Sequence, residues 1–109
     1  MSFQDGFYRV VFGTPIGEGA GVAHFAQGKV HGGDSMMAYV GTYQSDGERV
    51  SATVRVFTHS RQPDMQSVLG ADSATLALSG VVDGEIATLS GTAPEAPGVT
   101  LSLRLEPLS

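Results

Sequence analysis

The sequence predicts an all-β protein, an antiparallel up-and-down meander of about eight strands that closes into a barrel. Three observations lead to this prediction. Apolar and polar residues alternate with period two through much of the 109-residue chain, as in strands with one buried face. Short turn motifs separate the alternating segments, so sequential strands should pair antiparallel. Glycines recur inside the apparent strands, where they mark bends and close backbone approaches.

The strands follow from these patterns in chain order. Val10 and Phe12 share one face of the first strand, and Leu101, Leu103 and Leu105 alternate with polar residues in the last. The segments between them repeat the alternation, and each is bounded by turn residues. The expected strands are 6–13, 17–26, 29–34, 37–45, 48–59, 74–82, 85–93 and 99–106.

Three dipeptides predict the hairpin turns. Asp46-Gly47 and Asp83-Gly84 are typical of type I′ turns, in which both central residues have positive φ. Gln27-Gly28 is a weaker signal of the same kind. If it forms a two-residue turn, His24 lies opposite His31 on the neighbouring strand.

One segment departs from the strand pattern. Residues 63–69 are expected to form a short helical turn, because Pro63 suits a helix start and Gly70 a C-terminal stop. Neither this segment nor the proline-bearing loop at 92–98 is long enough to separate domains. We therefore expect residues 1–109 to form a single β-barrel domain, whose closure removes exposed sheet edges.

Charge and composition argue against several classes of partner. The formal net charge is −5 and no basic stripe is present, so neither direct nucleic-acid binding nor membrane binding is expected. Cysteine is absent, which rules out disulfides and thiolate metal sites. No signal peptide is visible, and no apolar run approaches the roughly 20 residues of a spanning helix. We therefore expect a cytoplasmic location.

Candidate catalytic and metal-binding groups are few. His24 and His31 could share a metal ion, but a tight site needs three or four ligands, and nearby Lys29 indicates a solvent-facing surface. No Gly-x-Ser-x-Gly elbow is present. The glycines of segment 17–21 lack the strand–turn–helix context of a dinucleotide-binding loop. We expect no enzymatic activity, no cofactor and no metal ion.

The barrel interior offers an alternative function. An eight-stranded barrel is just wide enough to be packed solid or to hold one small ligand. Candidate lining residues are Phe25, Tyr39, Tyr43 and Phe57, which would make the protein a carrier of a small apolar ligand. Val11 and Phe57 could instead lie on the outer face, where an apolar patch would mark an association surface.

Four motifs follow one another in the first half of the chain: Asp5-Gly6-Phe7-Tyr8, Gly17-Glu18-Gly19, Gly32-Gly33-Asp34 and Tyr39-Val40-Gly41. In their order and spacing, over roughly residues 5–60, they resemble the GrlR-like negative regulators of type III secretion. Those bacterial proteins are small lipocalin-like β-barrels that form homodimers. In the enteric members the barrel binds a transcriptional activator and holds it inactive. The resemblance thus implies a non-enzymatic, homodimeric regulator with a protein partner.

The resemblance also implies a partner-binding site. In the enteric members an acidic run is implicated in the turn after the Tyr-x-Gly strand, and the matching segment here is 45–49. Asp46 and Glu48 keep two of the acids, whereas Arg49 replaces a third. Because charge complementarity selects partners, we expect Asp46 and Glu48 to contact a regulatory protein and Arg49 to tune the specificity.

Overall fold

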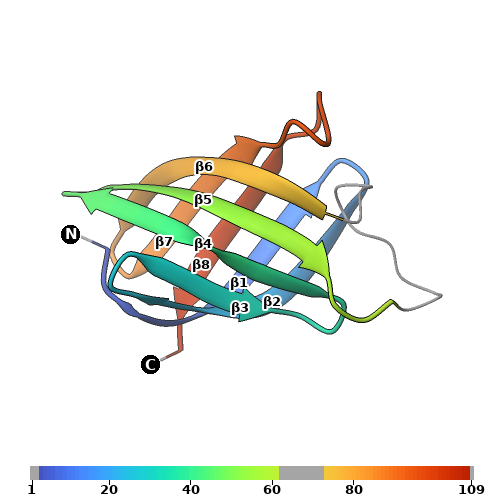
Figure 1. Ribbon diagram of the computed structural model, residues 1–109. Helices are drawn as coiled ribbons and strands as arrows, with labels where there is room; N and C mark the ends of the chain where they lie inside the picture. Colours follow the sequence, from blue (N-terminus) through green and yellow to red (C-terminus); the bar gives the residue numbers. More distant parts are fainter. Residues whose placement is uncertain (1–2, 62–72, 109) are drawn as a thin grey trace.

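The computed structural model describes residues 3–61 and 73–108, which form one closed antiparallel β-barrel (Figure 1). Its strands are β1 (Gly6–Thr14), β2 (Gly17–Ala26), β3 (Lys29–Gly33), β4 (Met37–Asp46), β5 (Arg49–Thr58), β6 (Ser73–Asp83), β7 (Ile86–Thr92) and β8 (Leu101–Pro107). Each strand pairs with the next, and β8 returns to β1 with Leu105 opposite Val10. The predicted fold class, strand order and closure are confirmed. The expected helical turn at 63–69 lies outside the described residues.

The β4–β5 turn differs in type from the prediction. Asp46 pairs with Arg49, so the two central residues are Gly47 and Glu48. Gly47 has a φ of 62° and Glu48 has no positive φ, which is typical of a type II′ turn with glycine in the first central position. The β6–β7 turn repeats this form around Gly84, whose φ is 69°. The type I′ prediction was therefore wrong at both turns.

The β2–β3 turn does have the predicted form. Gln27 and Gly28 have φ values of 54° and 79°, and two positive values in succession define a type I′ turn. The resulting register places His24 opposite His31, as predicted. Both histidines are exposed on the outer face of the barrel. Within residues 3–61 and 73–108, no group of three histidine or acidic side chains could hold a metal ion.

The interior of the barrel is apolar. Along β5 the buried side chains are Val50, Ala52, Val54 and Val56, and the residues between them face solvent. The same alternation runs through β6, and none of the described residues is a buried polar or charged one. Each fully buried aliphatic side chain contributes about 1.5–3 kcal/mol of transfer free energy, so this alternation fixes which face of every strand turns inward.

An aromatic cluster, here called the plug, fills one end of the barrel. It consists of Phe3, Tyr8, Phe25 and Tyr43. Phe3 stacks on Tyr8 with ring centroids 5.1 Å apart, and Phe25 meets Tyr43 edge-on at 5.2 Å. Such ring pairs add about 0.5–1.5 kcal/mol each beyond their buried area. The opposite end, where β1, β3 and β5 finish, is here called the mouth.

Candidate functional site

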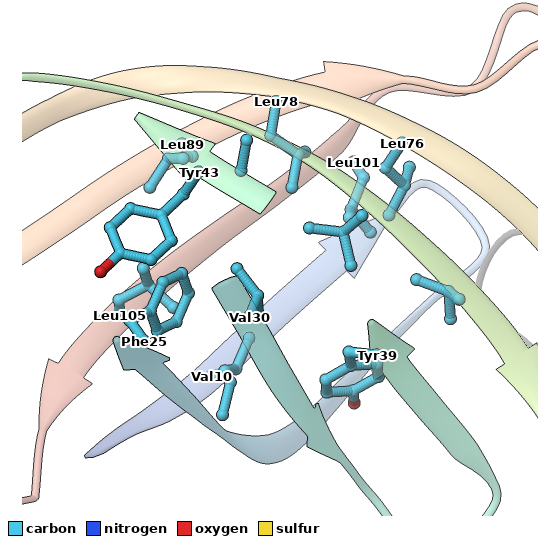
Figure 2. Close-up of a cluster of buried hydrophobic side chains, with 14 of the residues drawn as sticks. Val10, Phe25, Val30, Tyr39, Tyr43, Leu76, Leu78, Leu89, Leu101 and Leu105 are labelled. Atoms are coloured by element: carbon cyan, nitrogen blue, oxygen red, sulfur yellow. The ribbon is translucent and has the colours of Figure 1, made fainter. Parts of the chain in front are cut away.

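An apolar cavity of about 170 Å³ lies inside the barrel, between the plug and the mouth. Side chains from all eight strands line it, and Figure 2 shows Val10, Val30, Leu76 and Leu78 pointing into the same interior space. The cavity is smaller than the roughly 300 Å³ at which pockets for drug-sized ligands begin. A large lipid therefore exceeds the volume of this cavity.

The mouth side of the cavity is lined by less buried residues. Phe12 and Leu103 are partly buried and pack against the core, whereas Glu18 and Ser35 are exposed. The ring of Phe12 meets that of Tyr39 edge-on, with the centroids 6.2 Å apart. These aromatic and aliphatic groups border the mouth, through which a molecule could reach the interior.

Asp34 organises the loop between β3 and β4 at this mouth. Its Oδ1 accepts hydrogen bonds from the backbone amides of Met36, at 2.8 Å, and Met37, at 2.7 Å. Its Oδ2 accepts a hydrogen bond from the hydroxyl of Tyr39. Burial, and then this bond to a carboxylate, raise the pKa of Tyr39 well above its usual value. One acidic side chain thus joins the loop to the cavity wall.

Gly21 makes room for that tyrosine. A Cβ atom added at position 21 would lie 2.7 Å from the Tyr39 hydroxyl oxygen and 2.7 Å from the carbonyl oxygen of Gly33. Distances below 3.0 Å are not tolerated without movement of one of the groups. Glycine is therefore required on β2 for Tyr39 to reach Asp34.

A second acid, Asp5, makes an equivalent connection at the plug. It accepts hydrogen bonds from the Tyr43 hydroxyl and, at 3.2 Å, from the backbone amide of Gln27. These two bonds lower the pKa of Asp5. Burial, followed by the bond to Asp5, raises the pKa of Tyr43 to about 12.

The polar residues of the motifs therefore serve the barrel itself. Asp5 and Asp34 accept hydrogen bonds from the hydroxyls of Tyr43 and Tyr39, and the Tyr8 hydroxyl donates to the carbonyl of Gln4. The spacing of these acids and tyrosines is explained by the construction of the two barrel ends. It does not identify a partner or a substrate.

His59 has partners that the sequence did not reveal. Its Nε2 lies 2.9 Å from the carbonyl oxygen of Asp34, and its Nδ1 lies 2.8 Å from Ser60 Oγ. Since a carbonyl can only accept, Nε2 donates and Nδ1 accepts from the serine hydroxyl. A serine beside a histidine resembles a nucleophile and its base. However, the backbone amides of His59 and Ser60 both donate to Met36, which leaves neither to stabilise an oxyanion.

We therefore interpret this group as a clasp. Two backbone bonds to Met36 and one side-chain bond to Asp34 tie the end of β5 to the β3–β4 loop. The contact joins positions 25 residues apart in the chain. Only the register of β3, β4 and β5 brings them together, so no local motif could have predicted it.

The four candidate cavity residues separate into three groups. Phe25 and Tyr39 line the cavity, and Tyr43 belongs to the plug. Phe57 lies on the outer face of β5, where the guanidinium of Arg55 sits 4.5 Å from its ring centroid. Along β5 the even-numbered residues from 50 to 56 face inward. Since successive side chains point to opposite faces, the odd-numbered Phe57 faces away from the cavity.

The three candidate partner-binding residues lie together at the tip of the β4–β5 hairpin. Asp46, Glu48 and Arg49 are all exposed. The backbone amide of Val82 donates to the Glu48 carbonyl at 2.7 Å, so the tip is fixed against β6. This bond also brings the tip next to the β6–β7 turn. We call the four exposed acids of these two turns the acidic rim: Asp46, Glu48, Asp83 and Glu85.

No family model matches the chain, and no curated protein matches it. Among the described residues, no helix has the length and apolar character needed to cross a membrane.

Proposed function

We propose that this protein is a non-enzymatic regulatory binding protein that sequesters another protein through the tip of the β4–β5 hairpin. The single observation that supports the proposal best is the joint exposure of Asp46, Glu48 and Arg49 on a tip whose backbone is fixed to β6. A fixed tip loses little conformational entropy when a partner binds, and it presents its charges in one arrangement.

The resemblance to negative regulators of type III secretion supports the choice of this hairpin. In that family, an acidic run in the corresponding turn is implicated in binding a transcriptional activator. Four carboxylates and Arg49 lie on the two adjacent turns. A partner with a basic surface would be attracted to this rim, and its association would slow as salt is added. The protein would act in the cytoplasm, as a homodimer, by covering its partner.

The test uses a charge reversal and a matched control. The tagged wild-type protein, the variant Asp46→Lys/Glu48→Lys and the variant Asp83→Lys/Glu85→Lys are used to capture proteins from the native cell. The protein that is retained is then purified and titrated. We expect the first variant to lose about tenfold or more in affinity and the second to lose less.

A captured protein that binds wild type and Asp46→Lys/Glu48→Lys with equal affinity would remove the hairpin tip from the binding site. Titration at two salt concentrations adds a second readout, since an electrostatically assisted complex forms more slowly at high salt. Arg49→Glu tests specificity separately, because it restores an acid without changing the turn.

A further inference from the structure

We infer that the barrel interior is a binding site for one compact, uncharged apolar molecule, of the size of a single aromatic ring with a short substituent. The site is the 170 Å³ cavity between the plug and the mouth. It is distinct from the acidic rim, which lies at the other end of the barrel beside the plug, so this inference does not depend on the proposed function.

The size of the ligand follows from the volume. An engineered apolar cavity of about 150 Å³ in another protein stays free of water and binds benzene. The present cavity is slightly larger, at about 170 Å³. An extended acyl chain would need an open path through the barrel. The ring of Phe25 lies at the plug side of the cavity and packs against Phe3 and Tyr43, which closes that path.

The polarity of the ligand follows from the lining. The inner wall consists of aliphatic side chains and aromatic rings, and the buried residues described include no polar or charged one. An apolar molecule would therefore exchange water for dispersion contacts on all sides. The buried ring of Tyr39 brings a hydroxyl to this wall, and that hydroxyl already donates its hydrogen bond to Asp34. A ligand that needs a hydrogen-bond donor deep in the barrel is disfavoured.

The charge of the ligand follows from the mouth. Glu18 and Asp34 are the two charged side chains among the described residues that line the cavity, and both are acidic. A carboxylate or phosphate group at the mouth would lie near these acids with no lysine or arginine of the lining to offset them. A fatty acid or an anionic phospholipid is therefore a poor ligand, whereas a neutral ring is not repelled.

The test compares three probes with one protein. Toluene is a neutral ring, benzoate is the same ring with a carboxylate, and 1-dodecanol is a neutral long chain. Methyl NMR follows Val54, Leu76 and Leu78, and the unfolding midpoint is recorded with each probe, since binding to the folded state raises it. We expect toluene to shift these methyl signals and raise the midpoint, and the other two probes to bind at least about tenfold more weakly.

Two substitutions locate the binding. Ala52→Leu fills part of the cavity, and Ala77→Leu adds the same group to the exposed outer face of β6. Toluene affinity should fall about tenfold or more in the first and stay unchanged in the second. If Ala52→Leu loses the circular dichroism of the barrel, Val54→Ile replaces it, and weaker toluene binding is again expected.

Three results would overturn the inference. One is the absence of toluene binding to the wild type up to its solubility limit. Another is equal binding of toluene to the wild type and to a folded cavity-filled variant. The third is binding of benzoate or 1-dodecanol as tight as that of toluene. Charge reversal at Asp46 and Glu48 should not change toluene binding, so failure of either proposal can be recognised separately.

Discussion

The hydroxyl of Tyr39 on β4 donates a hydrogen bond to the carboxylate of Asp34, which also holds the amides of Met36 and Met37. This pair connects the buried wall of the barrel to the loop that borders its mouth. The tyrosine contributes a ring to the cavity and the aspartate contributes a charge to the mouth. The position of the loop and the shape of the cavity are therefore coupled through one bond.

Tyr39→Phe should destabilise the fold. The substitution removes a hydrogen bond to a charged group, which is worth about 1.5–3 kcal/mol. Tyr8→Phe is the matched control, because its hydroxyl donates to the neutral carbonyl of Gln4 and is worth about 0.5–1.5 kcal/mol. Urea denaturation at neutral pH measures both. Equal losses in the two variants would show that the Asp34 charge adds nothing.

Gly21→Ala should also destabilise the barrel, by about 1–3 kcal/mol, because the new methyl group overlaps Tyr39 and the Gly33 carbonyl. Gly13→Ala is the control, since its Cβ would meet only ordinary contacts, the nearest 3.4 Å away at Glu18. The unfolding free energies of the two variants are compared with the wild type. A stable Gly21→Ala protein with the Tyr39 signals unmoved would contradict the fit described here.

Asp5 should make stability depend on pH in the acid range. Its folded pKa is lowered by the bonds from Tyr43 and Gln27, while an unfolded aspartate titrates near pH 3.9. The folded state therefore binds fewer protons, and the stabilisation is complete above about pH 4 and is lost as the pH falls through the lowered pKa. Asp5→Asn should flatten this loss in urea denaturation series between about pH 5 and pH 2. An unchanged slope would rule out Asp5 as a contributor.

Tyr43 should make stability depend on pH in the alkaline range. Its folded pKa is raised to about 12, whereas an unfolded tyrosine titrates near pH 10. Its contribution is complete below about pH 10 and is lost as the pH rises towards the folded value. The absorbance of tyrosinate during alkaline titration measures the folded-state pKa. Tyr43→Phe should remove one of the groups that titrate late. Tyr39→Phe should remove another, because the pKa of Tyr39 is raised even further.

His59→Ala should loosen the mouth. The variant loses the bond to the Asp34 carbonyl and the bond from Ser60, each worth about 0.5–1.5 kcal/mol, whereas Ser60→Ala loses only the second. Amide hydrogen exchange at Met36 and Met37 should rise more in His59→Ala than in Ser60→Ala. The same exchange rates in both variants would show that the clasp depends on the backbone bonds alone.

The strands could be predicted well because their signal is local. Alternation such as that of residues 50–56 depends only on which side chains are apolar, and every observed strand end lies within two residues of the expected one. Turn type was less predictable. Asp46-Gly47 suggested a type I′ turn, but the pairing of Asp46 with Arg49 moved the turn by one residue. Strand register selects the turn, and register depends on the neighbouring strands.

The candidate sites also combine features that follow from local sequence with features that depend on the packing of strands. Exposure of Asp46, Glu48 and Arg49 followed from their place in a polar turn. The sequence left two positions open for Phe57, the cavity wall and the outer face, and its odd-numbered place along β5 decides for the outer face. Asp34 gave no sign of its bond to Tyr39 beyond its place in a motif, because the bond depends on the space that Gly21 leaves on the neighbouring β2.

The sequence by itself determined an antiparallel all-β chain, the order of its strands and the face of each that turns inward. These properties depend on the periodicity of the residues and on short turns, which are local. Tertiary structure alone decided the volume of the interior, the acid–tyrosine pair at each end and the clasp at His59. The clasp and the bond between Tyr43 and Asp5 join residues 25 and 38 positions apart in the chain, and the bond between Tyr39 and Asp34 needs the space left by Gly21 on another strand. The interior volume is set only when β8 closes onto β1.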